Sequence, residues 1–262
     1  MQVPEGVPYV TVEPRTRITL IDGFALSGAQ DGPGPGGSEL PRGVQRLVAH
    51  LCLSGRPPRA AIAGRLWPDV PEDHANGSLR SALWRLQKVA PGLIEVCGGS
   101  LCLAQGVRVD VRELHAWARR VRDPAVGLEE VEISGAGLCG ELLPGWYDDW
   151  VLLERERLCQ VRLHALECLA DRLATAGRYG DALEAAYAAV RAEPLRESAH
   201  RTVVRVHLAE GNTSQALRAY EALRAMLADE LGVLPSEHMT RLLHRIPRPA
   251  HNGHAIGTVT RQ

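Results

Sequence analysis

The feature that most restricts the fold is a repeated segment in the second half of the chain. Residues 176–183 read AGRYGDAL and residues 210–217 read EGNTSQAL, so Gly, Ala and Leu recur in phase at an offset of 34 residues. A unit of this length holds two helices and a turn, and it cannot bury its apolar face alone. Stacked helix pairs are therefore expected, with the small residues Ala182, Ala189 and Ala216 at the contacts between helices.

The region around this repeat is predicted to be helical throughout. Helical patterns begin at Asp110 and continue to about Arg245, and Pro194 closes the first repeat unit. A 34-residue helix pair is typical of tetratricopeptide-like arrays, which present a groove to a partner. Alignment with such a groove places these side chains on its inner surface: His164, Glu167, Asp171, Arg201 and Arg205. Two interpretations stay open, a docking surface for a peptide or polymerase segment and an ordinary solvated face.

The first half of the chain has a different pattern, short strands followed by helices. Residues 17–26, RITLIDGFAL, are rich in β-forming residues and contain an Asp-Gly turn signal. Residues 31–37, DGPGPGG, are expected to form a loop because their Gly and Pro exclude a helix or a central strand. Helical spacing of apolar residues then predicts one helix over residues 41–54 and a second over residues 58–67.

A third helix is predicted over Asn76–Lys88, with a cap near Asp73 and a stop at Pro91-Gly92. Its apolar stripe consists of Leu79, Ala82, Leu83 and Leu86. Its opposite face carries Arg80, Ser81, Trp84, Arg85 and Lys88. Arg and Lys on an exposed helix are the groups that contact phosphates and guanine edges. Many surface helices have a cationic side that meets only water, so the flanking segments decide between the two interpretations.

A β-hairpin is predicted directly after this helix. LIEVC at residues 93–97 and SLCLA at residues 100–104 flank Gly98-Gly99, and a Gly pair supplies the positive φ angles of a tight primed turn. Strands, three helices and a hairpin in this order form a winged helix-turn-helix, whose third helix enters the major groove of DNA. The expected contacts are Arg80, Arg85 and Lys88 with bases and phosphates, and Arg46 and Arg59 with flanking phosphates.

Charge is distributed unevenly, although the formal net charge is only −1. Residues 41–109 hold nine Lys or Arg against four acidic residues, a net +5, whereas residues 1–40 and 110–262 each sum to −3. Neutralisation of phosphates supplies most non-specific affinity for nucleic acid. A basic segment followed by a slightly acidic one fits a DNA-binding module joined to a protein-interacting module.

Composition predicts a two-domain protein of the cytoplasm with no membrane partner. A chain of 262 residues with 45% hydrophobic content is long enough for two cores, and only 4% of its residues are aromatic, which favours packing of Leu, Val and Ala. The longest apolar runs fall well short of the ~18 residues of a membrane helix. No secretion signal follows Met1.

Neither a cofactor, nor a metal site, nor enzymatic activity is expected. The six cysteines lack C-x-x-C pairs and zinc-spaced histidines, so we interpret them as small apolar residues. Cys97 and Cys102 flank the Gly pair, and the alternative of a redox switch across the hairpin stays open. Asp148-Asp149, beside three aromatic residues, is interpreted as a helix start rather than a carboxylate site. No phosphate-binding glycine motif follows a strand.

Motifs in both halves carry a resemblance to a known family. They are RLWPDVPEDHANGSLRSALWRL at 65–86, DVRELHAW at 110–117, ELLPGWYDDWVLLERERL at 141–158, EPLRESAHR at 193–201 and DELGVLPS at 229–236. Over residues 16–245 the chain resembles the SARP-type bacterial transcriptional regulators, the antibiotic regulatory protein family. That family joins an OmpR-like winged helix to a bacterial transcriptional activation domain.

The resemblance implies sequence-specific binding to double-stranded promoter DNA and activation by recruitment of RNA polymerase. It places the DNA contacts on the third helix and the wing, here Arg80, Ser81, Trp84, Arg85, Lys88, Gly98, Gly99 and Ser100. Trp84 is bulkier than the polar residue expected in a groove, so packing on the wing is an alternative. No ATPase module like that of the larger family members follows the motifs, so nucleotide-driven control is not expected.

The sequence thus predicts a mainly α protein, a winged helix-turn-helix of the α+β kind followed by an all-α tetratricopeptide-like array. The expected segments are a disordered arm at 1–15, a DNA-binding domain at 16–108, an activation domain at 109–246 and a disordered tail at 247–262. The alternative function is a protein-interaction module whose winged helix binds protein instead of DNA. The target promoter, activation against repression, a small effector, and a monomer against a homodimer all stay open.

Overall fold

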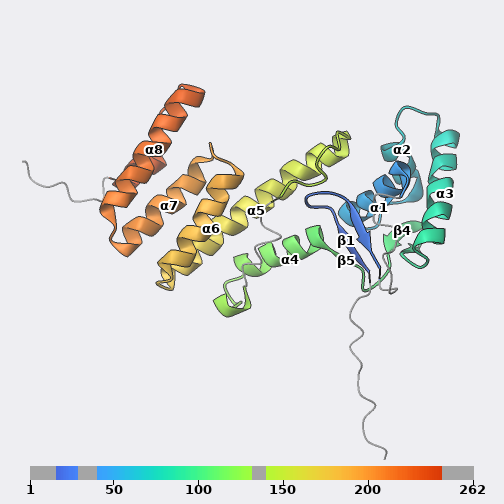
Figure 1. Cartoon of the computed structure of the whole chain (residues 1–262), viewed down its shortest axis with the longest axis horizontal. Helices are drawn as coiled ribbons and strands as arrows, with labels where there is room; N and C mark the ends of the chain where they lie inside the picture. The colour runs from blue at the N-terminus through green and yellow to red at the C-terminus, as the bar shows by residue number, and fades with distance from the viewer. Residues whose placement is uncertain (1–15, 29–39, 132–139, 244–262) are drawn as a thin grey trace, which may run out of the picture. The chain divides into compact units, whose positions relative to one another are not determined.

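The computed structural model of the protein describes residues 16–28, 40–131 and 140–243 (Figure 1). The expected arm, the loop at 31–37 and the expected tail lie outside these ranges. Contacts divide the chain into two compact units, Met1–Ala165 and Leu166–Gln262. Both are mainly helical, which confirms the predicted fold class. In the described ranges, no helix has both the length and the apolar character needed to cross a membrane.

The first unit opens on a small sheet with the strand order β2-β1-β5. Its strands are β1 (Arg17–Thr19), β2 (Ala25–Ser27) and β5 (Arg108–Val109), with β1 antiparallel to β2 and parallel to β5. The predicted Asp-Gly turn joins β1 to β2, and Asp22 has a φ of 63°, a left-handed conformation that Asp tolerates. Ile18, at the centre of β1, is fully buried.

Three helices follow, α1 (Arg42–Ser54), α2 (Arg59–Leu66) and α3 (Glu72–Val89). The helix predicted over Asn76–Lys88, with a cap near Asp73, begins at Glu72, close to that expected cap. In its first turn the carbonyl of Pro71 accepts hydrogen bonds from the backbone N–H groups of His74 and Ala75. Glu72 and Asp73 add negative charge at the positive end of the helix dipole.

The predicted hairpin is present as β3 (Ile94–Cys97) and β4 (Ser100–Leu103), with Cys97 paired to Ser100. Gly98 and Gly99 have φ angles of 58° and 82°, the pair of positive values that a two-residue primed turn requires. Strand β4 also reaches the loop between α1 and α2, because Leu101 N–H donates to the carbonyl of Pro57 at 3.2 Å. The hairpin is therefore fixed to the helix-turn-helix, as a wing is.

Helix α4 (Asp110–Arg122) is tied to the winged helix by its first residues. The Asp110 carboxylate accepts the backbone N–H groups of Leu20 and Ile21, each at 2.8 Å. Arg112 donates to the carbonyls of Leu51 and Cys52 at 3.0 and 3.2 Å. Contacts divide the chain after residue 165, whereas the sequence predicts a domain boundary between residues 108 and 109, and that boundary stays a prediction.

The segment that resembles the second-domain motif at 141–158 also belongs to the first unit. Leu142, Leu143, Trp146 and Trp150 are buried, and Leu143 N–H donates to the carbonyl of Leu20 at 2.8 Å. Helix α5 (Asp149–Thr175) begins directly after Asp148, which confirms the interpretation of Asp148-Asp149 as a helix start. A short 3-10 turn, η2 (Leu128–Glu130), lies between α4 and α5 in the chain.

The second unit holds the end of α5 and the helices α6 (Tyr179–Ala192), α7 (Glu197–Glu210), α8 (Thr213–Leu231) and α9 (Glu237–Leu243). The 34-residue repeat is visible in its turns. Gly177 and Gly211 have φ angles of 75° and 87°. Across these turns, Arg178 N–H donates to the carbonyl of Leu173 at 2.9 Å and Asn212 N–H to that of His207 at 2.8 Å.

Small residues lie at the helix contacts of this array, as the repeat predicted. Ala182, Ala189 and Ala216 have no exposed surface. Adjacent helices in the chain, α6 with α7 and α7 with α8, pack against each other (Figure 1). A buried cluster closes the end of the array and consists of Val204, Ala216, Leu223, Leu227 and Met239.

Candidate nucleic-acid interface

Helix α3 separates its residues into two faces, as predicted. Leu79, Ala82 and Leu86 are between 2 and 5% exposed and pack toward α1 and α2, whereas Leu83 is only half-buried. The side chains predicted to face DNA are all exposed, namely Arg80, Ser81, Trp84, Arg85 and Lys88. The helix therefore offers cationic and hydrogen-bonding groups to solvent along its length.

Trp84 lies on the outer face and not in the core, with 60% of its surface exposed. The Lys88 Nζ atom lies 3.7 Å from the centroid of the Trp84 ring. A cation over an aromatic face is attracted by the ring quadrupole, and the i, i+4 spacing on a helix allows the contact. The pair thus holds the Lys88 ammonium close to the helix surface.

A concave surface borders α3. A pocket of about 810 Å³ is lined by Arg80, Ser81 and Arg85 together with Trp67 and Val70 of the turn between α2 and α3. The start of α1 supplies part of the lining as well. The groups expected to read bases therefore stand on the wall of a depression, where an approaching ligand loses water on more than one side.

The wing brings further predicted residues together. Gly98 and Gly99 at its tip are exposed, and Ser100 is half-buried where it forms a bridge with Pro58. Arg59 follows Pro58 as the first residue of α2, and its side chain is exposed. The structure thus places the predicted cation Arg59 near the turn end of the wing, directly after the residue that bridges to Ser100.

Arg46 has a different environment from the other predicted phosphate contacts. Its guanidinium group forms an ion pair with Asp148, and the two side chains are only 21% and 17% exposed. One turn earlier on α1, the Arg42 guanidinium lies 3.6 Å from the centroid of the Trp146 ring. We therefore expect Arg46 to contribute less to DNA binding than the exposed cations of α3. The acidic partner, Asp148, lies in the YDDW motif. It is 102 residues from Arg46 in the chain, so no local pattern indicated the pairing.

The wing also contains the cysteine pair noted in the sequence. The Sγ atoms of Cys97 and Cys102 lie 3.1 Å apart, and Cys102 Sγ lies 3.7 Å from the carbonyl oxygen of Glu95. With the Glu95 carboxylate, the two thiols place three ligand atoms within 4.8 Å of one another. A structural zinc site takes four ligands, and this cluster supplies three. The hydrogen bond between Cys102 and Cys97, together with burial, raises the pKa of Cys102, so the thiol form is favoured over the reactive thiolate.

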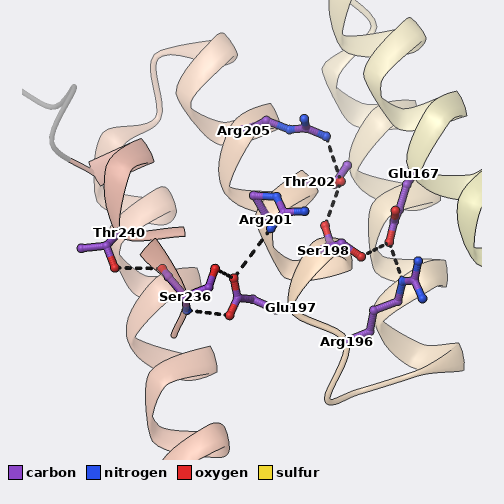
Figure 2. A network of polar contacts seen from close by, with 9 residues as sticks. All are labelled: Glu167, Arg196, Glu197, Ser198, Arg201, Thr202, Arg205, Ser236 and Thr240. Carbon is purple, nitrogen blue, oxygen red and sulfur yellow. Dashed lines mark hydrogen bonds and ion pairs between the residues drawn. The ribbon is translucent and has the colours of Figure 1, made fainter. Parts of the chain in front are cut away.

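Most groove residues predicted on the array are paired with groups of the array itself, and Figure 2 shows the contacts of Glu167 and Arg201. Glu167 accepts hydrogen bonds from Arg196 at 2.9 Å and from Ser198 at 2.6 Å. Arg205 Nη2 lies 2.7 and 2.8 Å from the two carboxylate oxygens of Asp171, the residue 34 positions earlier. Burial raises the pKa of Asp171, and Arg205 opposes that shift.

The other two members of this set differ from each other. Arg201 lies 3.7 Å from Glu197, which also accepts hydrogen bonds from the backbone N–H and the hydroxyl of Ser236. His164 is exposed. Sequence reasoning missed the pairing of Glu197 with Ser236, which joins two of the family motifs, EPLRESAHR and DELGVLPS. These motifs therefore hold α9 against α7 (Figure 2).

The fold and this surface define a class of protein, mainly helical chains in which a winged helix with an exposed cationic helix precedes a helical-repeat array. Comparison with known families is more specific. The family described as "bacterial transcriptional activator domain" matches residues 99–247, more than half of the chain. The chain belongs to this family and is a SARP-type transcriptional regulator, as its motifs predicted.

Its relatives are regulatory proteins. Regulatory protein AfsR of Streptomyces coelicolor is 30% identical over 219 residues, which cover 76% of this chain and 21% of AfsR. Regulatory protein DnrI of Streptomyces peucetius is 34% identical over 231 residues, 79% of this chain and 84% of DnrI. The chain thus spans about a fifth of the length of AfsR and most of that of DnrI.

A solved structure supports the fold. EmbR of Mycobacterium tuberculosis, in complex with a low affinity phosphopeptide, superposes with a TM-score of 0.68 at 19% identity. The match covers 88% of this chain and 64% of EmbR. At this identity the likeness concerns the fold, a winged helix followed by a helical array.

Proposed function

We propose that the protein binds promoter DNA in a sequence-specific manner, with α3 in the major groove and the wing on the backbone, and that it activates transcription by recruiting RNA polymerase. The DNA-binding part of this proposal rests on the exposure of the three cationic side chains of α3. Arg80, Arg85 and Lys88 are exposed, and none of them forms an ion pair with a residue that the structure describes. Their charge is available to an external anion.

The individual roles follow from side-chain chemistry. The guanidinium groups of Arg80 and Arg85 can each donate two hydrogen bonds to O6 and N7 of a guanine, the commonest specific contact in the major groove. Lys88 is a point charge suited to a phosphate, and its contact with Trp84 limits its motion. Arg59, Gly98, Gly99 and Ser100 are expected to contact the adjacent backbone, because they lie together at the turn end of the wing.

The test is DNA binding as a function of salt, measured by fluorescence anisotropy on promoter fragments recovered by DNA capture with the purified protein. Wild-type affinity should fall steeply with salt, because bound cations release counterions from the phosphates. Lys88→Gln should lower the log-log slope by about one and weaken all sequences similarly. Arg80→Gln and Arg85→Gln should each cost about 1–3 kcal/mol and relax the sequence preference.

The matched control is Arg191→Gln, because Arg191 is exposed on α6, outside the winged helix. Its affinity and salt slope should equal those of the wild type. Binding that is indifferent to salt, or that survives Arg80→Gln combined with Arg85→Gln, would refute the DNA-binding role of α3. Recruitment of polymerase is tested separately, by in vitro transcription from the captured promoter with and without the protein.

A further inference from the structure

A second pocket lies in the first unit and involves none of the α3 residues proposed to contact DNA. It has a volume of about 540 Å³ and is lined by the end of α1, strand β4, α4 and the first turns of α5. Its apolar wall includes Cys52, Leu53, Leu103 and Val111. Its polar wall consists of Arg56, Arg112, His115, Arg119, Glu154 and Arg157. This volume is in the range of small-molecule sites.

The charges of this pocket do not balance. Four arginines face a single carboxylate, that of Glu154, so the lining carries a formal charge of +3 when His115 is neutral. The carboxylate is shared with only one of them, because Arg157 Nη1 lies 3.5 Å from Glu154 Oε2. All four arginines are exposed, so water screens much of their mutual repulsion, and an anion bound among them would lower the remainder.

Two of the four arginines, Arg56 and Arg119, have side-chain N–H groups that are not used within the described ranges. Arg112 is held by neutral acceptors, the carbonyls of Leu51 and Cys52. In contrast, the guanidinium groups of Arg56 and Arg119 make no hydrogen bond and no ion pair with any residue in the described ranges. They come from two different segments of the chain, the loop after α1 and the last turn of α4.

The pKa of His115 is lowered in this positive environment. Burial lowers its pKa, and the nearby Arg157 and Arg119 lower it further. A histidine between arginines stays neutral near pH 7, so it offers one donor and one acceptor rather than another charge. The pocket therefore combines guanidinium groups and an imidazole with apolar side chains.

We propose that this pocket binds a small organic anion, with its carboxylate or phosphate group held by Arg56 and Arg119 and its apolar part against Leu103 and Val111. Guanidinium groups match such anions in a two-pronged geometry and keep their charge at any physiological pH. Leu103 belongs to β4, so a bound anion contacts the base of the wing. The proposed site includes none of the α3 residues that we propose to contact DNA.

The experiment is isothermal titration calorimetry on the full chain with two probes, pyrophosphate and citrate, at constant ionic strength set with chloride. Saturable binding of one or both probes with one site per chain is expected. Arg56→Gln combined with Arg119→Gln should weaken it at least about ten-fold. Arg119→Gln alone should weaken it by a smaller factor. The control is Arg218→Gln, an exposed arginine on α8, which should bind like the wild type.

Two outcomes would overturn the proposal. One is the absence of saturable heat with both probes, and the other is equal affinity of the double variant, with circular dichroism showing that it is folded. A parallel titration with random-sequence duplex identifies the alternative source of phosphate. If the free probes do not bind but the double variant loses DNA affinity and salt slope, the pocket contacts the DNA backbone instead. No promoter is needed, so failure of the proposed DNA recognition by α3 leaves this test intact.

Discussion

Arginine residues of the winged helix fall into two environments that residue type alone does not distinguish. Arg80 and Arg85 are exposed on α3, whereas Arg46 forms an ion pair with Asp148 and Arg42 lies over the ring of Trp146. A guanidinium group that is already paired and mostly buried gains little from a phosphate, because it must first give up its partner. The local basic excess of the sequence therefore overstates the charge that DNA can use.

Arg46→Gln should lower stability and leave the salt slope of DNA binding unchanged. The substitution leaves Asp148, which is 17% exposed, without its charged partner, and the expected loss is about 2 kcal/mol in the free energy of unfolding. Urea denaturation measures it, with the exposed Arg80→Gln as a control that should change stability by less than about 0.5 kcal/mol. Wild-type stability together with a reduced salt slope would identify Arg46 as a DNA contact.

His50 predicts a pH dependence of stability. It is 3% exposed, its ring meets Trp150 edge-on with centroids 5.3 Å apart, and Nδ1 lies 3.1 Å from Ser54 Oγ. Burial, with a contribution from Arg65, lowers the pKa of His50 from 6.5 to about 4. The unfolded chain therefore binds a proton more readily, so this contribution to stability is complete above pH 6.5 and is lost as the pH falls toward 4.

The measurement is urea denaturation at pH 7, 6 and 5 on the wild type and on His50→Gln. Within this window the wild type should lose up to about 1.4 kcal/mol per pH unit more than the variant, which removes the titrating group. Other groups that titrate in the window affect both proteins equally, so the difference isolates His50. Parallel curves for the two proteins would show that the histidine is protonated in the folded state without cost.

At the scale of elements, the turns of the array depend on backbone conformation more than on side-chain contacts. Gly177 ends α5 with a φ of 75°, and Gly180, three residues later, lies inside α6. A Cβ atom at either position would meet nothing within 4 Å. The two glycines thus differ in φ and not in available space, which makes them a matched pair.

Gly177→Ala and Gly180→Ala should change stability in opposite directions. Alanine at position 177 must adopt the left-handed region, at a cost of about 1–2 kcal/mol. Alanine at position 180 should stabilise the protein by about 0.5–1 kcal/mol, because glycine loses more backbone entropy in a helix. Thermal unfolding followed by circular dichroism measures both, and effects of the same sign would contradict the turn geometry.

At the scale of the whole molecule, the family motifs divide the chain in one place and its contacts divide it in another. Asp110 caps backbone groups of residues 20 and 21, and Leu143 donates to Leu20, so α4 and the residues before α5 complete the winged helix. The DNA-binding segment expected at 16–108 consequently lacks part of its own core when taken alone. Cooperative folding is expected only when these later residues are present.

Two fragments test this expectation. Residues 1–175, which end with α5, should unfold in one cooperative transition, whereas residues 1–109 should show a shallow transition with a low denaturant m-value, since m follows the surface exposed on unfolding. The comparison is made by urea denaturation followed by tryptophan fluorescence and circular dichroism. A sharp transition in the shorter fragment would place the folding boundary at residue 109 after all.

The sequence by itself determined the type and order of the elements. Local signals were sufficient for that, namely the Gly pair of the hairpin, the apolar stripe of α3 and the 34-residue repeat, because turn geometry and helical periodicity act over a few residues. The cap of α3 was expected near Asp73 and lies at Pro71, because a proline and two acids extend the helix beyond its apolar stripe.

Only the tertiary structure decided which charges are free. Arg46 and Asp148 are 102 residues apart in the chain, Glu197 and Ser236 are 39 apart, and the basic pocket draws on four separate elements. Pairings of this kind depend on how elements pack, and packing is set by the sum of many weak contacts rather than by a local pattern. The exposed face of α3 could therefore be predicted from the sequence, whereas the ion pair of Arg46 with Asp148 and the pocket at Arg56 and Arg119 could not.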